Sequence, residues 1–496
     1  MTYLKIKLTY ILLIIPLFLF TNPVTVTCSA EEKAVPVPAP GRPAYTYAIV
    51  VSSATYDDPE WQKVAEKLVQ KHNAKILKWD EDVEEVKDQL AQIMPKYTAF
   101  VARPEEAGHA FVVKISRMCR ELDDDPYVNT FWGIVTGYSA EDALRMVSLE
   151  EPLIVTRVLD ATGKIDLNVF DQGVCFDEFD RGFVTEKATG KPAAKRRCAN
   201  DDTKEFIAAM GRLDPQLIAT SAHATEHDWD MGYNGPNMKM EHQDGQLFCI
   251  DTEENRFALT NDEPKIFIGA GNCLIGNIDQ QDCMATSWMH SCGACQFIGY
   301  TVPTWFGEMG WGTLDKFVSQ GGVYTAAEAF HFNNTEIIRN IMGKYPQHVK
   351  TNLKNYDFDL DDGEIYRTLK VKKSDPDAQE LIGRLYDRDI VAFFGDPAFE
   401  VRVKPSVIVS TSKLQDGKFA GCWQIKIDAV SDGKWSDAGE TYFALPHSMK
   451  SVKCVDTNLN GDIDYADNFI LVALQGNYKK GDSFRIVLKE LPPSEK

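Results

Sequence analysis

Residues 265–273 read KIFIGAGNC, and residues 217–223 read LIATSAH. Each stretch begins as a short apolar strand, continues through small residues and ends on one reactive side chain. Ligands of open parallel sheets bind beyond the carboxyl ends of the strands. If the two predicted strands are neighbours in one sheet, His223 and Cys273 lie beside the same crevice.

Strands and helices alternate along most of the chain. Short apolar runs predict strands, and apolar residues at helical spacing predict helices between them, which is typical of a parallel sheet with helices on both faces. After residue 404 the pattern changes to short β-rich runs separated by turns, which predicts a small β-sandwich. The predicted fold class is α/β, with a mostly parallel sheet flanked by helices in two subdomains, 45–152 and 153–404, and a β domain at 405–496.

The amino terminus predicts export. Lys5 and Lys7 precede an apolar run at residues 10–20, and small residues then lead to Ala30. This is the pattern of a signal peptide, here 1–30. The apolar run is short for a membrane span. A lipid anchor on Cys28 is an alternative. We expect the protein in the periplasm, at the cell surface or outside the cell.

Two segments are expected to lie outside the regular elements, and the net charge of the chain limits its expected partners. Residues 31–44 are rich in proline and alanine and predict an extended linker, and residues 185–204 predict an exposed loop. The 496-residue sequence has a formal net charge of −20. Nucleic acid is excluded as an expected partner, because binding to phosphates requires a basic face. No membrane span is expected after signal cleavage.

A thiol beside an imidazole is the arrangement of a nucleophilic catalyst. The thiolate attacks a carbonyl carbon, and the imidazole promotes the thiolate and donates a proton to the leaving amine. Cys273 is the predicted nucleophile and His223 its partner. Small neighbouring residues leave main-chain N–H groups accessible, so those of Ala224 and Cys273 are the predicted oxyanion donors.

Several motifs resemble the gingipain family of cysteine peptidases. The stretch 222–229 (AHATEHDW) is similar to its catalytic histidine segment, and 271–276 (GNCLIG) lies where the family has its nucleophile. Residues 282–288, 299–308 and 394–398 resemble the helix after the nucleophile, the next strand and the Gly-Asp-Pro-Ala end of the catalytic domain. The resemblance implies a caspase-like fold with a preceding α/β subdomain and a following immunoglobulin-like module.

Two positions depart from the family pattern. Ala224 replaces the glycine that follows the family's histidine, and Asn272 precedes the cysteine where the family usually has a small residue. An inactive relative that acts as a surface or binding protein is therefore one alternative. The motifs assign neither a third, acidic partner nor a specificity pocket.

His223, Glu226 and His227 also match H-x-x-E-H, the inverted zinc-peptidase signature. That motif requires a helix, which brings both histidines to one zinc ion. Here an apolar strand precedes the motif, and a run rich in glycine, asparagine and proline follows it. A zinc metallopeptidase is the less favoured alternative.

Cys292 and Cys295 have the C-x-x-C spacing, with Cys283 upstream. This spacing occurs in metal and redox sites, but a second C-x-x-C is absent from the sequence. We expect a disulfide between Cys283 and one of the pair.

Residues 456–467 match the pattern of a calcium-binding loop. Glycine is at position 6, and oxygen ligands are at positions 1, 3, 5, 7, 9 and 12: Asp456, Asn458, Asn460, Asp462, Asp464 and Asp467. The alternative is an acidic turn without metal. Any calcium is expected to be structural, and catalysis requires no cofactor. The sequence thus predicts an exported cysteine endopeptidase that hydrolyses polypeptides through a Cys273–His223 dyad and a thioester intermediate.

Overall fold

The structure is a computed structural model that describes residues 46–491 except 234, 236, 321, 357–362 and 436–439. The predicted signal peptide, the linker and Cys28 lie outside the described residues. Within the described part of the chain, no helix is both long enough and apolar enough to cross a bilayer.

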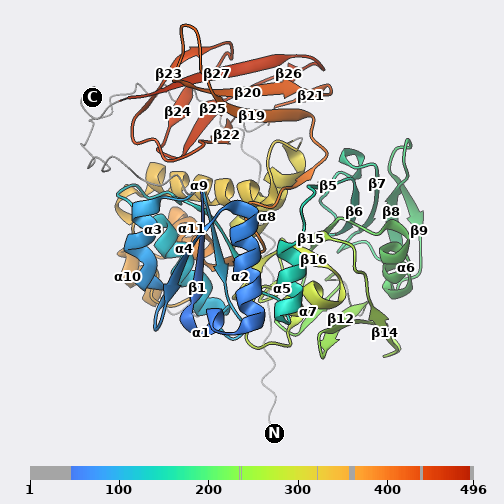
Figure 1. Ribbon diagram of the computed structural model, residues 1–496. Helices are drawn as coiled ribbons and strands as arrows, with labels where there is room; N and C mark the ends of the chain where they lie inside the picture. The colour runs from blue at the N-terminus through green and yellow to red at the C-terminus, as the bar shows by residue number, and fades with distance from the viewer. Residues whose placement is uncertain are drawn as a thin grey trace.

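One twelve-stranded sheet runs through both predicted α/β subdomains (Figure 1). Its spatial order is β2 (Lys75–Trp79), β1 (Tyr47–Ser52), β3 (Tyr97–Val101), β4 (Phe131–Val135), β17 (Val391–Phe394), β16 (Ala294–Tyr300), β15 (Lys265–Gly269), β10 (Leu217–Thr220), β6 (Arg157–Ala161), β7 (Gln172–Phe176), β8 (Phe183–Lys187) and β9 (Ala194–Arg197).

The sheet consists of two parallel groups that meet at β17. The strands β2, β1, β3, β4 and β17 are parallel to one another, as are β16, β15, β10, β6 and β7. The pair β16–β17 is antiparallel, and β8 and β9 continue the far edge antiparallel. A large, mostly parallel sheet is therefore confirmed. The boundary between subdomains at 152/153 stays a prediction.

Helices cover both faces of the sheet. Successive side chains of a strand point to opposite faces, so a single strand contributes to the core on each side. On β1, Ile49 and Val51 pack into a core with α2 and α5, whereas Ala48 and Val50 pack into the larger core that includes α4. The helices are α1 (Ser53–Tyr56), α2 (Pro59–His72), α3 (Lys87–Ile93), α4 (His109–Arg120), α5 (Ala140–Val147), α6 (Thr203–Leu213), α7 (Met284–Ser291), α8 (Glu308–Ser319), α9 (Ala326–Lys344), α10 (Glu364–Leu369) and α11 (Pro376–Ile390), with short 3-10 turns at Val83–Val86, Leu167–Val169 and Pro346–His348.

Antiparallel sheets form the carboxyl-terminal region, which lies above α9 in Figure 1. Arg339 of α9 contacts this region through ion pairs with Glu440 and Asp464. The predicted immunoglobulin-like class and the boundary at 404/405 stay predictions. The sheets are β19 (Val407–Lys413), β20 (Trp423–Ala429), β27 (Ser483–Glu490) and β23 (Val452–Thr457); β22 (Glu440–Ala444), β25 (Phe469–Ala473) and β24 (Ile463–Tyr465); and β21 (Gly433–Lys434) with β26 (Asn477–Tyr478).

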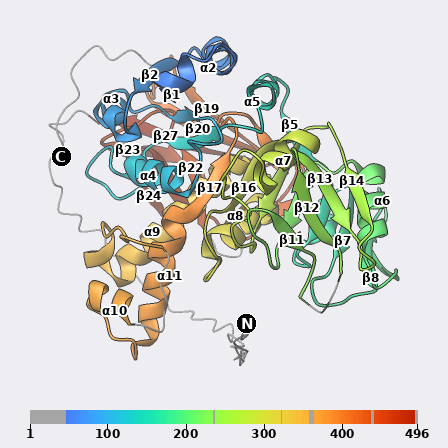
Figure 2. The ribbon, with the colours of Figure 1, turned by 90° about the horizontal axis from the view of Figure 1, so that it is seen from below.

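Two short sheets complete the α/β region. The pair β5 (Leu153–Val155) and β18 (Val401–Val403) is parallel. A second, antiparallel sheet lies next to α7 and away from α10 (Figure 2). Its strands are β11 (Asp228–Asp230), β12 (Lys239–Gln243), β13 (Gln246–Ile250) and β14 (Arg256–Leu259).

Candidate active site

His223 and Cys273 follow neighbouring strands. The strands β10 and β15 pair in parallel, with Leu217 opposite Ile266 and Thr220 opposite Gly269, so their carboxyl ends share one edge of the sheet. The loop after β10 carries His223, whose side chain is exposed, and the loop after β15 carries Cys273, which is partly buried and has a free thiol. The structure therefore brings together the two loops that the sequence singles out.

The buried side chain of Asn272 connects these two loops. Its side-chain amide donates to the carbonyl oxygens of Ser221 at 2.7 Å and Ala222 at 3.2 Å. The Thr220 hydroxyl donates to its side-chain oxygen at 2.7 Å. Asn272 is fully buried, and a buried polar group with partners at both ends restricts relative movement of the segments it joins.

The loop after β16 contacts the Cys273 thiol. The Thr304 backbone N–H lies 3.3 Å from Sγ of Cys273, and the Thr304 hydroxyl donates to the Asn272 carbonyl oxygen at 3.0 Å. Since β16 is the next parallel strand beside β15, its carboxyl end lies at the same edge of the sheet. Helix α8 approaches the loop after β15 so closely that a Cβ on Gly310 would lie 2.2 Å from the Ala270 carbonyl oxygen.

The histidine loop is held in a defined conformation. Ala222 has φ of 77°, a left-handed conformation that is uncommon outside glycine. The indole N–H of Trp229 donates to the Ser221 carbonyl oxygen at 2.7 Å, and the Asp230 N–H donates to the His223 carbonyl oxygen at 2.9 Å. Ala224 forms an isolated bridge with Trp229. The tryptophan of the AHATEHDW motif therefore supports the loop backbone from the interior, where it is fully buried.

Two backbone N–H groups are available at the predicted oxyanion positions. Within the described residues, the N–H groups of Ala224 and Cys273 donate to no other protein group. The structure gives no direct test of oxyanion binding, so this role stays a prediction.

Aromatic and acidic side chains surround His223. The ring of Tyr233 meets the imidazole edge to face, with centroids 5.1 Å apart, and the Phe179 ring stacks on Tyr233 at 5.5 Å. Burial and the nearby Asp228 carboxylate raise the pKa of Asp230, while positive charge on Lys239 or His223 lowers it. Asp230 is thus close enough to the imidazole to interact with its charge.

A cavity of about 480 Å³ opens beside His223. Carboxylates predominate among its charged groups, and Lys239 and His223 are the basic side chains among the lining residues described. The Lys239 ammonium group is paired with Asp228 at 2.9 Å and Glu241 at 3.0 Å. The acidic side chains of the lining are Asp230, Glu241, Asp251 and Glu254.

Cys283, Cys292 and Cys295 differ from Cys273 in burial. All ten cysteines of the described chain are free, so the expected disulfide between Cys283 and Cys292 or Cys295 is wrong in this structure. These three thiols are fully buried, and burial raises the pKa to about 11 for Cys283 and to about 12 for Cys292 and Cys295. They pack in the core around α7 and β16.

The H-x-x-E-H interpretation requires a helix that the structure lacks at this place. Residues 221–227 form a loop between β10 and β11. Among the described residues, His223 belongs to no group of three or more side chains with metal-binding atoms within 4.8 Å of one another, whereas Glu226 and His227 do, together with Asp279. The zinc site predicted from His223, Glu226 and His227 is therefore not formed.

The six predicted calcium ligands do not converge. Asp456 pairs with Arg485 at 2.5 Å, and Asp464 pairs with Arg339 at 3.4 Å. The Asn458 side-chain amide donates to the carbonyl oxygen of Ser483, in β27, at 3.0 Å. A strand, β24, occupies the second half of the loop and another strand follows it, so side chains alternate between two faces. Asn460 and Asp462 precede that strand. A calcium ion in this loop stays a prediction that the geometry does not favour.

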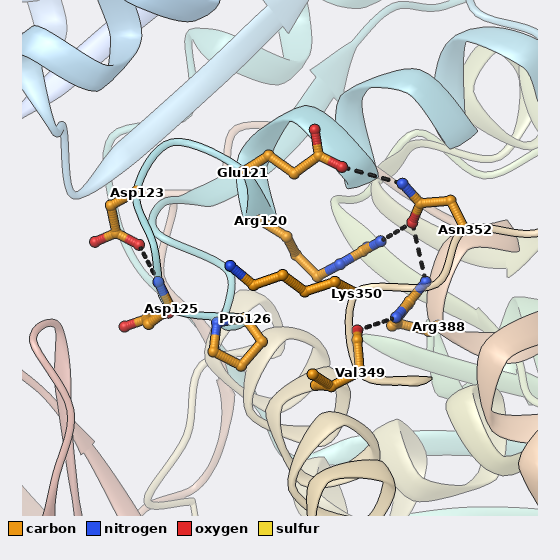
Figure 3. A pocket seen from close by; sticks show the side chains of 9 residues that line it. All are labelled: Arg120, Glu121, Asp123, Asp125, Pro126, Val349, Lys350, Asn352 and Arg388. Atoms are coloured by element: carbon orange, nitrogen blue, oxygen red, sulfur yellow. Dashed lines mark hydrogen bonds between the residues drawn. The ribbon is translucent and has the colours of Figure 1, made fainter. Parts of the chain in front are cut away.

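Asp467 lies elsewhere, in a carboxylate cluster with Asp123 and Asp125. Burial and the proximity of the other carboxylates raise the pKa of both Asp125 and Asp467. A neighbouring cavity of about 230 Å³ contains no cysteine or histidine among its described lining (Figure 3). There the Asn352 side-chain oxygen accepts from Arg120 at 3.3 Å and Arg388 at 3.2 Å. These arginines also pair with the buried Asp389, so their charges are already compensated.

No protein-family model and no curated protein matches the chain. Two solved structures are similar to it. The crystal structure of the Arg-specific cysteine proteinase gingipain R has a TM-score of 0.43 and 11% sequence identity, with 88% of this chain and 92% of that chain covered. A structure titled as a protease has a TM-score of 0.40 and 11% identity, with 90% and 95% covered. Likeness at this level does not establish membership of either protein's family.

Sequence reasoning did not identify three contributors to this site. Asn272 was noted only as a departure from a family pattern, and Thr304 and Tyr233 were not assigned a role. Thr304 follows the strand beside β15, so its position at the shared edge could have been inferred from strand order. Tyr233 lies between β11 and β12, two strands of the short antiparallel sheet that has no clear sequence signal.

Proposed function

We propose that this chain is an exported cysteine endopeptidase of caspase-like fold, with Cys273 as nucleophile and His223 as general acid and base. The observation that carries the proposal is the pairing of β10 with β15, which puts a free, partly exposed thiol and an exposed imidazole on loops that Asn272 joins. A thiol and an imidazole on adjacent loops supply the two groups that acyl transfer through a thiolate requires.

The proposed reaction begins when His223 takes the thiol proton of Cys273 and Sγ attacks the carbonyl carbon of a peptide bond. The carbonyl oxygen becomes an oxyanion, which the N–H groups of Ala224 and Cys273 stabilise. His223 protonates the departing amine, and a thioester remains on Sγ. His223 then takes a proton from water, which attacks the thioester and releases the acid product and the thiol.

The cavity beside His223 supports a preference for substrates with a basic side chain. Four carboxylates and one lysine line it, and that lysine is already paired with carboxylates. A cationic side chain would therefore enter a site of net negative charge, whereas an acidic one would be repelled.

Cleavage of a peptide library by the purified mature chain tests the proposal. We expect cleavage by the native chain, none by Cys273→Ala, and native rates from the control Cys454→Ala, whose thiol lies in β23. Cleavage that persists in Cys273→Ala would refute the thiol mechanism. A native chain that cleaves no peptide would instead favour the alternative of a surface or binding protein.

A further inference from the structure

A second cluster of titratable side chains lies on the loops that follow His223 and Cys273. Glu226 and His227 lie just before β11, and Asp279 lies between β15 and α7. One possible ligand atom from each of these three residues lies within 4.8 Å of the other two. The proposed dyad uses none of the three.

Hydrogen-bonding distances connect His227 to a second histidine and two carboxylates. Nδ1 of His227 is 3.1 Å from Nε2 of His242, and Nε2 of His227 is 3.1 Å from Oδ2 of Asp279. Nδ1 of His242 is in turn 3.0 Å from Oδ1 of Asp282. The backbone N–H groups of residues 244 and 245 donate to the Asp282 carboxylate at 2.9 Å each.

His242 and Asp282 hold the His227 ring from one side. His242 lies between the His227 ring and the Asp282 carboxylate, 3.1 Å from the first and 3.0 Å from the second. On the other side of the ring, Nε2 of His227 faces Oδ2 of Asp279 at 3.1 Å. A ring nitrogen that carries no proton can bind a metal ion, so this edge of the ring is free to act as a ligand toward Asp279.

A proton on Nε2 would satisfy the pair His227–Asp279 alone, whereas a metal ion would also use the nearby Glu226 carboxylate. Donors about 2.0–2.2 Å from one tetrahedral zinc ion lie roughly 3.3–3.6 Å apart, so the observed 3.1 Å would have to widen by only a few tenths of an ångström. The bond from His227 to His242, and from His242 to Asp282, is the outer-shell support that metal-binding histidines have.

We propose that Glu226, His227 and Asp279 bind a divalent transition-metal ion of the zinc class. The nitrogen ligand favours such an ion over calcium and magnesium, which prefer oxygen ligands alone. Three protein ligands leave a coordination position for water. The ion would join the loop that carries His223 to the loop that carries Cys273, and thereby stabilise the edge of the sheet where both loops lie. The site does not depend on the proposed peptidase activity.

Metal titration of the full mature chain, stripped with a chelator, tests this site. Calorimetry with Zn²⁺ and absorption with Co²⁺ should show one tight equivalent in the native chain. We expect His227→Gln and Asp279→Asn each to weaken binding by about 100-fold, and Asp282→Asn by about tenfold. His290→Gln is the matched control, because His290 pairs with Asp142 outside the cluster and its loss should leave binding unchanged.

Native-like affinity in His227→Gln or Asp279→Asn would overturn the proposal, as would absence of Zn²⁺ and Co²⁺ binding to the native chain. Melting temperatures of the metal-free variants should match that of the metal-free native chain, which separates ligand loss from misfolding. Cys273→Ala should bind the metal normally. A chain that binds zinc as described but cleaves no peptide would refute the peptidase and leave the metal site standing.

Discussion

The side-chain amide of Asn272 lies 2.7 Å from the carbonyl oxygen of Ser221, so the residue before the proposed nucleophile is bonded to the loop that carries His223. The same side chain accepts from the Thr220 hydroxyl at 2.7 Å and is fully buried. The residue that departs from the gingipain pattern thus has a structural role, because it fixes the carboxyl ends of β10 and β15 relative to each other.

Asn272→Ala tests this role. The substitution removes three buried hydrogen bonds, to Thr220, Ser221 and Ala222. The Ser221 carbonyl oxygen keeps its bond from Trp229, so two buried groups lose their partner. Such a loss costs about 1–3 kcal/mol for each group, so we expect the free energy of unfolding to fall by roughly 2–6 kcal/mol. Peptidase kcat should fall at least tenfold, because the thiol and imidazole lose their fixed relation.

Denaturant titration and steady-state kinetics measure the two effects. Asn168→Ala, at an exposed position, is the control and should change neither quantity. An Asn272→Ala variant with native stability and native kcat would contradict the structural role.

Selective alkylation follows from the burial of the other thiols. Burial shields Cys283, Cys292 and Cys295 from solvent and raises the pKa of each, so they stay protonated at neutral pH. Cys273 is partly exposed, and a backbone N–H faces its Sγ. Brief treatment of the native chain with iodoacetamide, followed by peptide mass spectrometry, should find Cys273 modified first. Equal modification of the three buried thiols would show that this packing is not maintained in solution.

Substrate charge should affect turnover through the cavity beside His223. Peptides that differ in one side chain, lysine or glutamate, should differ at least tenfold in kcat/KM in favour of lysine. Asp230→Asn removes one of the four lining carboxylates and should lower kcat/KM severalfold for the lysine peptide while sparing a neutral one. A preference for glutamate, or none, would mean that this cavity does not bind the substrate side chain.

The pH dependence of stability should reflect His331. Burial lowers its pKa to about 3, against about 6.5 for an unfolded histidine. The unfolded chain therefore binds a proton at this residue first as the pH falls, so the stabilisation is complete above pH 6.5 and is lost toward pH 3. The expected loss is on the order of 2 kcal/mol at pH 5.

Denaturation of native protein and of His331→Gln at pH 7 and pH 5 measures this contribution. The native chain should lose more stability between the two pH values than the variant does. Equal losses would indicate that His331 is not buried as a neutral ring.

Strands with both faces buried could be predicted from the sequence, because they consist of unbroken apolar runs. The strand expected at 217–220 is β10 at the same residues, and the one expected at 265–268 is β15, one residue longer. The loops that follow β10 and β15 could be inferred to be neighbours only by assuming that the two strands are adjacent in the sheet. That β10 pairs with β15 depends on long-range packing, which no local pattern encodes.

Strands at exposed edges could not be predicted. The segment 185–204, expected to be a loop, contains β9 and the end of β8, whose charged side chains pair across the strands, as Arg196 does with Glu186 at 2.7 Å. The sheet β11–β14 also contains many polar residues, and its strands resemble loops in composition. The calcium prediction rests on a local spacing of oxygen ligands, which the sequence has. The strands β24 and β25 stand where a helix would follow such a loop, and this difference depends on packing that the spacing does not encode.

The rate at which iodoacetamide alkylates Cys273 at neutral pH, in the native chain and in His223→Ala, tests the central claim most directly. If the imidazole and the thiol act together in one cleft, the substitution should slow alkylation at least tenfold while Asn168→Ala leaves the rate unchanged. Equal rates in the native chain and His223→Ala would contradict the dyad and with it the proposed peptidase.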